Sequence, residues 1–328
     1  MLIMNVHDRS RGFCYGPAMR RLFCLAAMLF ASSAHAQQDA RPFVVGGTGI
    51  AYARLQDAVA AIGNGSGTIF IAPGTYHECA VQAAGGITYR ALTPGTVLFD
   101  GGICEGKAAL VLRGRAAKVD GIIFEHMTVA DGNGAGIRLE RGDLSVENSV
   151  FRDSQEGLLT GSDPAGSITI LRSTFSGLGR CDGGLDCAHS LYVGDYASLS
   201  VQHCRFEAGT GGHYVKSRAR RVRIVDNSFD DSQGRATNYM IDLPKGALGE
   251  ISGNEMVQGA DKDNYSSFIA LGAEGAQQSS DGLSIGGNGA RFVPGVDRRS
   301  AFVADWTGAR LAIGQNTLSA GIMRYERR

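Results

Sequence analysis

The sequence is short of proline, of net charge and of long apolar runs. Only 7 of its 328 residues are proline, and Lys plus Arg and Asp plus Glu both number 32, so the formal net charge is zero. A neutral chain has no bulk attraction for nucleic acid, and we expect no such partner. The most apolar segment, residues 22–31, is too short to cross a bilayer. We therefore expect no membrane span in the mature chain.

The N-terminus has the pattern of an export signal. Arg20 and Arg21 precede the apolar segment, and a small-x-small sequence ends at Ala36. Together these features predict a secretory signal peptide over residues 1–36, with Met19 as an alternative start. Residues 37–43 look like a flexible join, and residues 44–328 form the predicted domain. We expect the protein to be secreted or periplasmic.

Glycine is abundant where proline is scarce. The chain has 47 glycines, about twice the average frequency and without a collagen period, which indicates many tight turns between short elements. Residues 52–62 have the apolar spacing of a short helix, and residues 68–76 read as a strand that ends in a turn. Strand-like runs follow at 87–91, 96–99 and 109–112.

From residue 119 onward a six-residue motif occurs eight times. Its first position is always Val or Ile, its sixth is Phe in five copies, and its fourth is Asn in the last four copies. The copies begin at residues 119, 146, 170, 201, 224, 251, 285 and 313. Their separation varies from 23 to 34 residues, which indicates a constant coil with loops of variable length.

A unit this short cannot bury its own apolar face, so neighbouring units must stack on it. Asn at one register favours parallel coils about 4.8 Å apart, in which each amide bonds the next turn. We therefore predict an all-β, single-stranded, right-handed parallel β-helix of roughly ten coils, capped by the N-terminal helix. A β-propeller would require blades of about 40 residues, which is longer than this repeat.

Five cysteines follow the signal peptide, so at least one is unpaired. In an oxidising compartment Cys181 and Cys187 could close a small loop, and Cys79 and Cys104 lie about one repeat apart. The remaining residue, Cys204, occupies the fourth motif position, between a Ser and an Asn of neighbouring copies. We expect it to be a small buried residue rather than a reactive thiol.

A second set of strands precedes the motif copies, at residues 190–195, 213–218, 239–244 and 267–275. If their aliphatic residues point inward, alternation places Tyr192, Lys216 and Asp242 outward, in one column across three coils. Arg218 lies on the same face, and His189 and His213 lie at its near edge. The long loops 176–188 and 259–266 should flank this face and make a groove suited to an extended polymer.

The chain resembles the pectate-lyase-like superfamily. Its helix and strand-Pro-Gly-x-Tyr entry is similar to the start of those β-helices. Residues 185–290 resemble a group of secreted bacterial β-helix proteins, through GHYVKSRA (212–219), YMIDLPKG (239–246) and the turn 272–275. The resemblance implies that Lys216, Arg218 and Asp242 belong to one motif. For the wider superfamily it implies lyases that eliminate across the uronic acids of an acidic polysaccharide.

Elimination requires a cation for the substrate carboxylate, a base and an acid. Arg218, with Arg220, is our candidate for the carboxylate. Lys216 is the base that the resemblance to Lys-dependent lyases implies. The candidate proton donors are Tyr192, His189 and His213. The expected further substrate contacts are Tyr214, Tyr239, Asp242 and Glu274. A tight Lys216–Asp242 pair would make Lys216 a binding residue and leave His213 or Tyr214 as the base.

Other functions stay open. The outward Lys216–Asp242 pair could be a surface ion pair on a non-catalytic polysaccharide- or envelope-binding protein. A C5-epimerase is a further alternative, although Asp163-Pro164 does not continue into the epimerase pattern. A glycoside hydrolase needs a carboxylate cluster. We expect no metal or cofactor. A calcium site at Asp182 and Asp186 is an alternative, but these residues could equally be solvated around a Cys181–Cys187 bridge.

Overall fold

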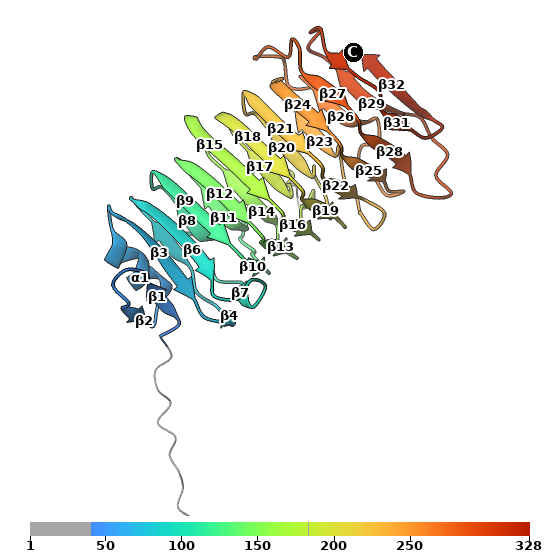
Figure 1. The fold of residues 1–328 in the computed structure, drawn as a ribbon. Helices are drawn as coiled ribbons and strands as arrows, with labels where there is room; N and C mark the ends of the chain where they lie inside the picture. The colour runs from blue at the N-terminus through green and yellow to red at the C-terminus, as the bar shows by residue number, and fades with distance from the viewer. Residues whose placement is uncertain (1–40, 183) are drawn as a thin grey trace, which may run out of the picture. The chain divides into compact units, whose positions relative to one another are not determined.

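The protein is a parallel β-solenoid (Figure 1). The computed structural model describes residues 41–182 and 184–328. The signal peptide predicted over residues 1–36 and most of the predicted join lie outside the described residues. No helix among the described residues is long and apolar enough to cross a membrane.

Three sheets run along the solenoid, and each coil contributes one short strand to each of them. Sheet A has twelve strands: β2 (Ala51–Tyr52), β1 (Phe43–Val45), β3 (Ser66–Ile71), β6 (Gly86–Ala91), β9 (Ala116–Asp120), β12 (Asp143–Glu147), β15 (Asp163–Leu171), β18 (Tyr196–Gln202), β21 (Arg221–Val225), β24 (Leu248–Ser252), β27 (Ser284–Gly286) and β30 (Ala312–Ile313). Apart from the antiparallel pairing of β1 with β2 and β3, neighbouring strands are parallel.

Sheets B and C have ten strands each, which agrees with the roughly ten coils predicted. Sheet B contains β4 (Gly74–Tyr76), β7 (Val97–Asp100), β10 (Ile122–Glu125), β13 (Val150–Arg152), β16 (Thr174–Ser176), β19 (Arg205–Glu207), β22 (Ser228–Asp230), β25 (Glu255–Gln258), β28 (Gly289–Phe292) and β31 (Thr317–Leu318). Sheet C contains β5 (Ala80–Gln82), β8 (Ala108–Leu112), β11 (Ala135–Leu139), β14 (Glu156–Thr160), β17 (Leu191–Val193), β20 (Val215–Ser217), β23 (Ile241–Leu243), β26 (Ser267–Leu271), β29 (Ser300–Asp305) and β32 (Ile322–Arg327).

The predicted capping helix is present as α1 (Leu55–Ile62), which packs against β1 and β5 at the first coil. Leu55, Ala58 and Val59 are buried on one of its faces. The helix begins three residues later than the apolar spacing predicts, because Ala51 and Tyr52 pair with β1 instead. Its buried face covers the apolar end that the first coil would otherwise expose to water.

Two ladders of the repeat motif build the core. The five sixth-position phenylalanines stack with ring centroids 4.8–5.1 Å apart, along Phe124, Phe151, Phe175, Phe206 and Phe229. Phe99 of the preceding coil extends this stack at 5.7 Å. The fourth-position asparagines are joined by amide hydrogen bonds of 2.9 Å, along Asn227, Asn254, Asn288 and Asn316. Each of these carbonyls also accepts the backbone N–H of the preceding ladder residue. Repeated residues therefore stack in register, as predicted.

The cysteines pair as the spacing suggested. Cys79 bonds Cys104, and Cys181 bonds Cys187. Cys204 is free and buried in the asparagine ladder, where its backbone N–H donates to Asn227. Burial raises the pKa of its thiol to about 11. A thiol in this state is inert at neutral pH, so Cys204 fills space rather than reacts.

Candidate functional site

The predicted outward column lies on sheet C. Strand pairing places Tyr192 of β17 beside Lys216 of β20, and Lys216 beside Asp242 of β23. The strands hold these side chains outward because the flanking aliphatic residues, among them Leu191 and Val215, are completely buried in the core. Alternation along each short strand then leaves one outward residue per coil.

A second column runs beside the first, at the position where each coil enters sheet C. It contains Glu156, His189, His213 and Tyr239. The His189 and His213 rings stack with centroids 5.0 Å apart, and His213 and Tyr239 follow at 5.4 Å. Each side chain accepts the backbone N–H of the next coil: Glu156 from His189 (3.3 Å), His189 from His213 (3.0 Å) and His213 from Tyr239 (3.2 Å). The column is therefore a side-chain ladder.

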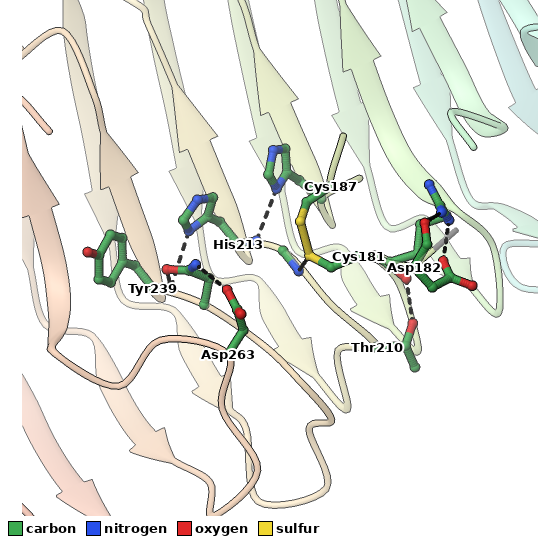
Figure 2. Close-up of a disulfide and its surroundings, with 12 residues drawn as sticks. Cys181, Asp182, Cys187, Thr210, His213, Tyr239 and Asp263 are labelled. Carbon is green, nitrogen blue, oxygen red and sulfur yellow. Dashed lines mark hydrogen bonds and ion pairs between the residues drawn. A yellow bond between two sulfur atoms is a disulfide. The ribbon is translucent and has the colours of Figure 1, made fainter. Parts of the chain in front are cut away.

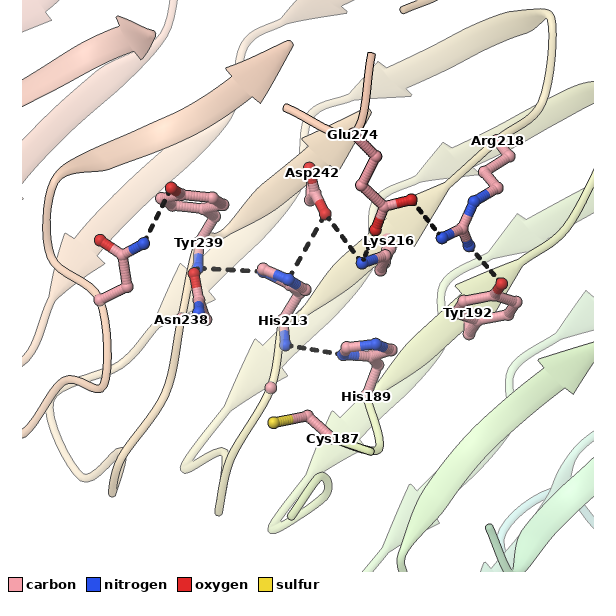
Figure 3. A network of polar contacts seen from close by, with 12 residues as sticks. Cys187, His189, Tyr192, His213, Lys216, Arg218, Asn238, Tyr239, Asp242 and Glu274 are labelled. Carbon is pink, nitrogen blue, oxygen red and sulfur yellow. Dashed lines mark hydrogen bonds and ion pairs between the residues drawn. The ribbon is translucent and has the colours of Figure 1, made fainter. Parts of the chain in front are cut away.

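This ladder determines which ring nitrogens carry protons. In His189 and His213 the Nδ1 atom accepts a backbone N–H, so a neutral ring carries its proton on Nε2. Burial lowers the pKa of His189 to about 3 and that of His213 well below its usual value, and nearby Lys216 lowers both further. Both imidazoles are neutral donors at pH 7. The Nε2 atom of His213 lies 3.4 Å from Asp242 (Figure 3).

Lys216 and its neighbour Arg218 hold one carboxylate between them (Figure 3). Lys216 Nζ lies 2.6 Å from one oxygen of Glu274, and Arg218 Nη2 lies 2.5 Å from the other. Partial burial raises the pKa of Glu274, but the hydrogen bonds from these two cations outweigh it and the pKa lies below its usual value. Glu274 sits on the loop after β26, and its side chain is 41% exposed.

Arg218 also connects this pair to Tyr192. Its guanidinium carbon lies 5.1 Å from the centre of the Tyr192 ring, and its NH1 donates to the Tyr192 hydroxyl oxygen. The phenolic proton is therefore free to point away from Arg218.

Asp242 is more deeply buried than Glu274. It is 3% exposed, and one of its oxygens lies 3.4 Å from Lys216 Nζ. The other oxygen is buried and has no hydrogen-bond partner among the described residues. Burial raises the pKa of Asp242 to about 6, although Lys216 opposes the shift. Lys216 therefore contacts two carboxylates, which is the arrangement expected of a binding residue.

These residues surround a groove of about 640 Å³ on sheet C. Six of the ten sequence candidates line it: His189, Tyr192, His213, Lys216, Arg218 and Glu274. Figure 2 shows the Cys181–Cys187 bridge. The loop that it closes contributes Asp186 and Cys187 to the lining of the groove. Of the two loops predicted to flank the groove, 176–188 does so. Loop 259–266 contributes none of the described lining residues, and the Glu274 loop takes that place.

Two candidates lie away from the groove. Tyr214 is 1% exposed and donates to Asp231 at 2.7 Å, so its side chain lies within the core. Alternation would place Tyr214 on the same face as Lys216, but β20 begins only at Val215. From its buried position Tyr214 cannot serve as the base or substrate contact that the sequence suggested. Arg220 lies 3.7 Å from Asp195 in a separate depression of about 420 Å³. Arg220 immediately precedes β21 of sheet A, and Leu248 of sheet A lines the same depression.

Two further candidates support the groove from beneath or beside it. Asp242 does not line the cavity itself but contacts Lys216 and His213, which do. Tyr239 continues the histidine stack and accepts a hydrogen bond from Asn264 at 2.8 Å.

Sequence reasoning missed Arg138 and Glu156. Both residues line the groove. Burial raises the pKa of Glu156 well above its usual value. The position of Glu156 could have been found from strand register. Glu156 lies two residues before the inward Leu158, just as His189 lies two residues before Leu191, and these two leucines pair.

Potential metal ligands gather elsewhere. Among the described residues, Asp100, Glu125 and His126 form a group whose ligand atoms lie within 4.8 Å of one another. Arg152 already pairs with Glu125 at 2.5 Å, and His126 with Asp100 at 2.8 Å. Asp182, considered for calcium from the sequence, pairs with Arg180 at 2.7 Å. Calcium binding at this loop stays a prediction.

Comparison with known proteins supports the fold. Among solved structures, an alginate lyase of family PL6 matches with a TM-score of 0.54 and 13% identity, over 81% of this chain and 39% of that enzyme. The chain thus spans well under half of that lyase's length. A pectin methylesterase from Aspergillus niger matches with a TM-score of 0.52 and 15% identity, over 86% of both chains. At these identities the likeness shows the fold alone.

At the level of sequence, no curated protein matches the chain. A family model does match: the one described as "Right handed beta helix region" covers residues 108–272, half of the chain. That stretch includes β8 through β26, the strands that carry both columns of the groove. The protein therefore belongs to the right-handed β-helix family.

Proposed function

We propose that the protein is an exported polysaccharide lyase that binds a uronic-acid residue in the groove and cleaves the chain by β-elimination. The observation that carries the proposal is the Glu274 contact. Lys216 and Arg218 approach the two oxygens of one carboxylate at 2.6 and 2.5 Å. A substrate carboxylate of the same geometry fits the same two cations once Glu274 moves away. Structures of the same fold named as an alginate lyase and a pectin methylesterase support a polysaccharide ligand.

In this mechanism Lys216 and Arg218 neutralise the carboxylate. Removal of the proton at C5 places negative charge on that carboxylate as the C5 carbanion forms. Two positively charged donors in a partly buried groove stabilise this charge most where water is excluded. Because Lys216 also contacts Asp242, it acts here as a binding residue and not as the base.

Tyr192 is our candidate for proton transfer. Its oxygen accepts a hydrogen bond from Arg218, beside the proposed carboxylate site. The phenolate takes the C5 proton, a C4–C5 double bond forms, and the C4–O4 bond breaks. The leaving O4 then takes the proton back from the phenol, which regenerates the phenolate. One residue can perform both transfers when the C5 proton and O4 lie on the same face of the sugar.

His189 and His213 do not take part in the proton transfer. Their lone pairs at Nδ1 are occupied by backbone donors, so neither His189 nor His213 accepts a proton there. His189 offers its Nε2–H to a sugar hydroxyl, whereas the Nε2–H of His213 faces Asp242. This same observation favours the second candidate function, a non-catalytic protein that binds acidic polysaccharide. The predicted signal peptide would place either activity outside the cytoplasm.

The test is a screen of the protein from residue 37 onward against uronate-containing polysaccharides. The signal is the near-ultraviolet absorbance of the unsaturated sugar that elimination leaves. We expect one polymer to give a signal that disappears in Tyr192→Phe and Arg218→Ala. Arg220→Ala is the matched control, because Arg220 lies outside the groove, and should keep full activity. No signal with any polymer, but saturable binding that requires Arg218, would replace the lyase with the binding protein.

A further inference from the structure

The far end of the groove holds two polar groups that the carboxylate site does not use. Arg138 of β11 and Glu156 of β14 line the same cavity as Lys216 and Arg218. The Nε atom of Arg138 and the Oε2 atom of Glu156 are buried, and neither has a hydrogen-bond partner among the described residues. Buried polar atoms in native folds are normally paired, so a bound molecule is expected to supply the partners.

Arg138 supplies the positive charge at this end of the groove. Glu156 is 2% exposed, and its Oε1 accepts the backbone N–H of His189. Burial raises the pKa of Glu156 well above its usual value, which disfavours a negative charge on this carboxyl. A cation beside a carboxyl whose charge is disfavoured suits an anionic, oxygen-rich group.

The strand register fixes the distance between the two ends of the groove. Arg138 pairs with Leu159, and Leu159 pairs with Tyr192, so Arg138 lies two coils from Tyr192. The Arg218 guanidinium lies over the Tyr192 ring. Two coils correspond to about 10 Å at the usual strand spacing. This spacing is close to the repeat of an extended 1,4-linked glycan, so two coils span two sugars.

We propose that Arg138 and Glu156 form a second subsite for an acidic sugar, two residues along the glycan from the uronate held by Lys216 and Arg218. The proposal rests on the function proposed for the groove. The sugar between the two subsites lies over Leu159, the apolar residue between the Arg138 and Tyr192 positions. The ligand is thus a glycan of at least three sugars with acidic groups on the first and third.

The test measures the affinity of oligouronates of one to four residues by calorimetry. Tyr192→Phe serves as the background, so that the ligand is not consumed. We expect the affinity to rise by about 10- to 100-fold between the oligouronate of two sugars and that of three, which is the size of one charge-assisted contact. Arg138→Gln should remove that gain and leave the affinity of the monomer and dimer unchanged.

Two controls separate the subsite from a structural effect. Glu156→Gln keeps an oxygen for His189 and a donor for the ligand, and it should retain the gain. Arg141→Gln changes the same charge on a neighbouring residue outside the groove, and it should have no effect.

Three outcomes overturn the subsite: a gain that persists in Arg138→Gln, equal weakening at every length, or no binding of any oligouronate. A gain that depends on Arg138 establishes it, even where the absorbance assay shows that the wild-type protein eliminates nothing. In that case the proposed lyase activity fails and the subsite stands.

Discussion

Removing the negative charge of Glu274 should tighten the binding of an acidic glycan. Glu274 contacts Lys216 and Arg218 where our proposal places the substrate carboxylate, so the two carboxylates compete for the same donors. Glu274→Gln keeps the shape of the side chain and removes its charge. The variant leaves both cations available to the ligand.

The expected change in affinity follows from the exposure of the Glu274 side chain. Glu274 is 41% exposed, so each of its two ion pairs is screened and contributes no more than about 1 kcal/mol. Displacing both therefore costs the wild-type protein about 1–2 kcal/mol. Without that cost, the affinity for a uronate tetrasaccharide should rise by about 5- to 30-fold.

The assay is calorimetry with this tetrasaccharide, with Tyr192→Phe as the background. Glu250→Gln is the matched control, because Glu250 is an exposed carboxylate near Arg223 on sheet A. It should leave the affinity unchanged. A weaker affinity in Glu274→Gln would refute the reasoning, because it would mean that Glu274 contacts the substrate directly.

Three further predictions concern stability. The pKa of Asp242 is raised to about 6 in the folded protein. The free energy of unfolding should therefore fall by about 3 kcal/mol in total as pH rises from about 4 to 6. Denaturant titrations of Asp242→Asn should lack this pH dependence. Asn254→Ala leaves a buried backbone N–H without its partner and should cost at least about 2 kcal/mol, more than the same change at the half-buried end of the ladder, Asn316. Cys79→Ala should lower the free energy of unfolding by about 3–4 kcal/mol, because the disulfide to Cys104 closes a loop of 25 residues. An unchanged unfolding midpoint would show that the loop is ordered without the disulfide.

The fold could be predicted from the sequence because each copy of the repeat corresponds to one coil of the solenoid. A stacked coil requires the same residue type at the same register, so the Phe and Asn positions of the motif are read as ladders without knowledge of the structure. The outward column of Tyr192, Lys216 and Asp242 followed from alternation on strands whose inward residues are aliphatic. These inferences depend only on local periodicity.

The rest of the site depends on loops and on the ends of strands, where periodicity gives no guide. Tyr214 and Arg220 flank β20 and turn away from the groove. Glu274 reaches Lys216 across 58 residues of sequence. Glu156 and Arg138 lie in coils whose strands show no unusual concentration of polar residues. That both residues line the groove becomes visible only when the neighbouring coils are placed side by side.

The most direct test of the account is a crystal structure of the Tyr192→Phe variant with a uronate tetrasaccharide. We predict one sugar carboxylate within hydrogen-bond distance of both Lys216 and Arg218, with Glu274 displaced and a second carboxylate near Arg138. A glycan bound elsewhere on the solenoid, with the Glu274 contacts intact, would contradict the account.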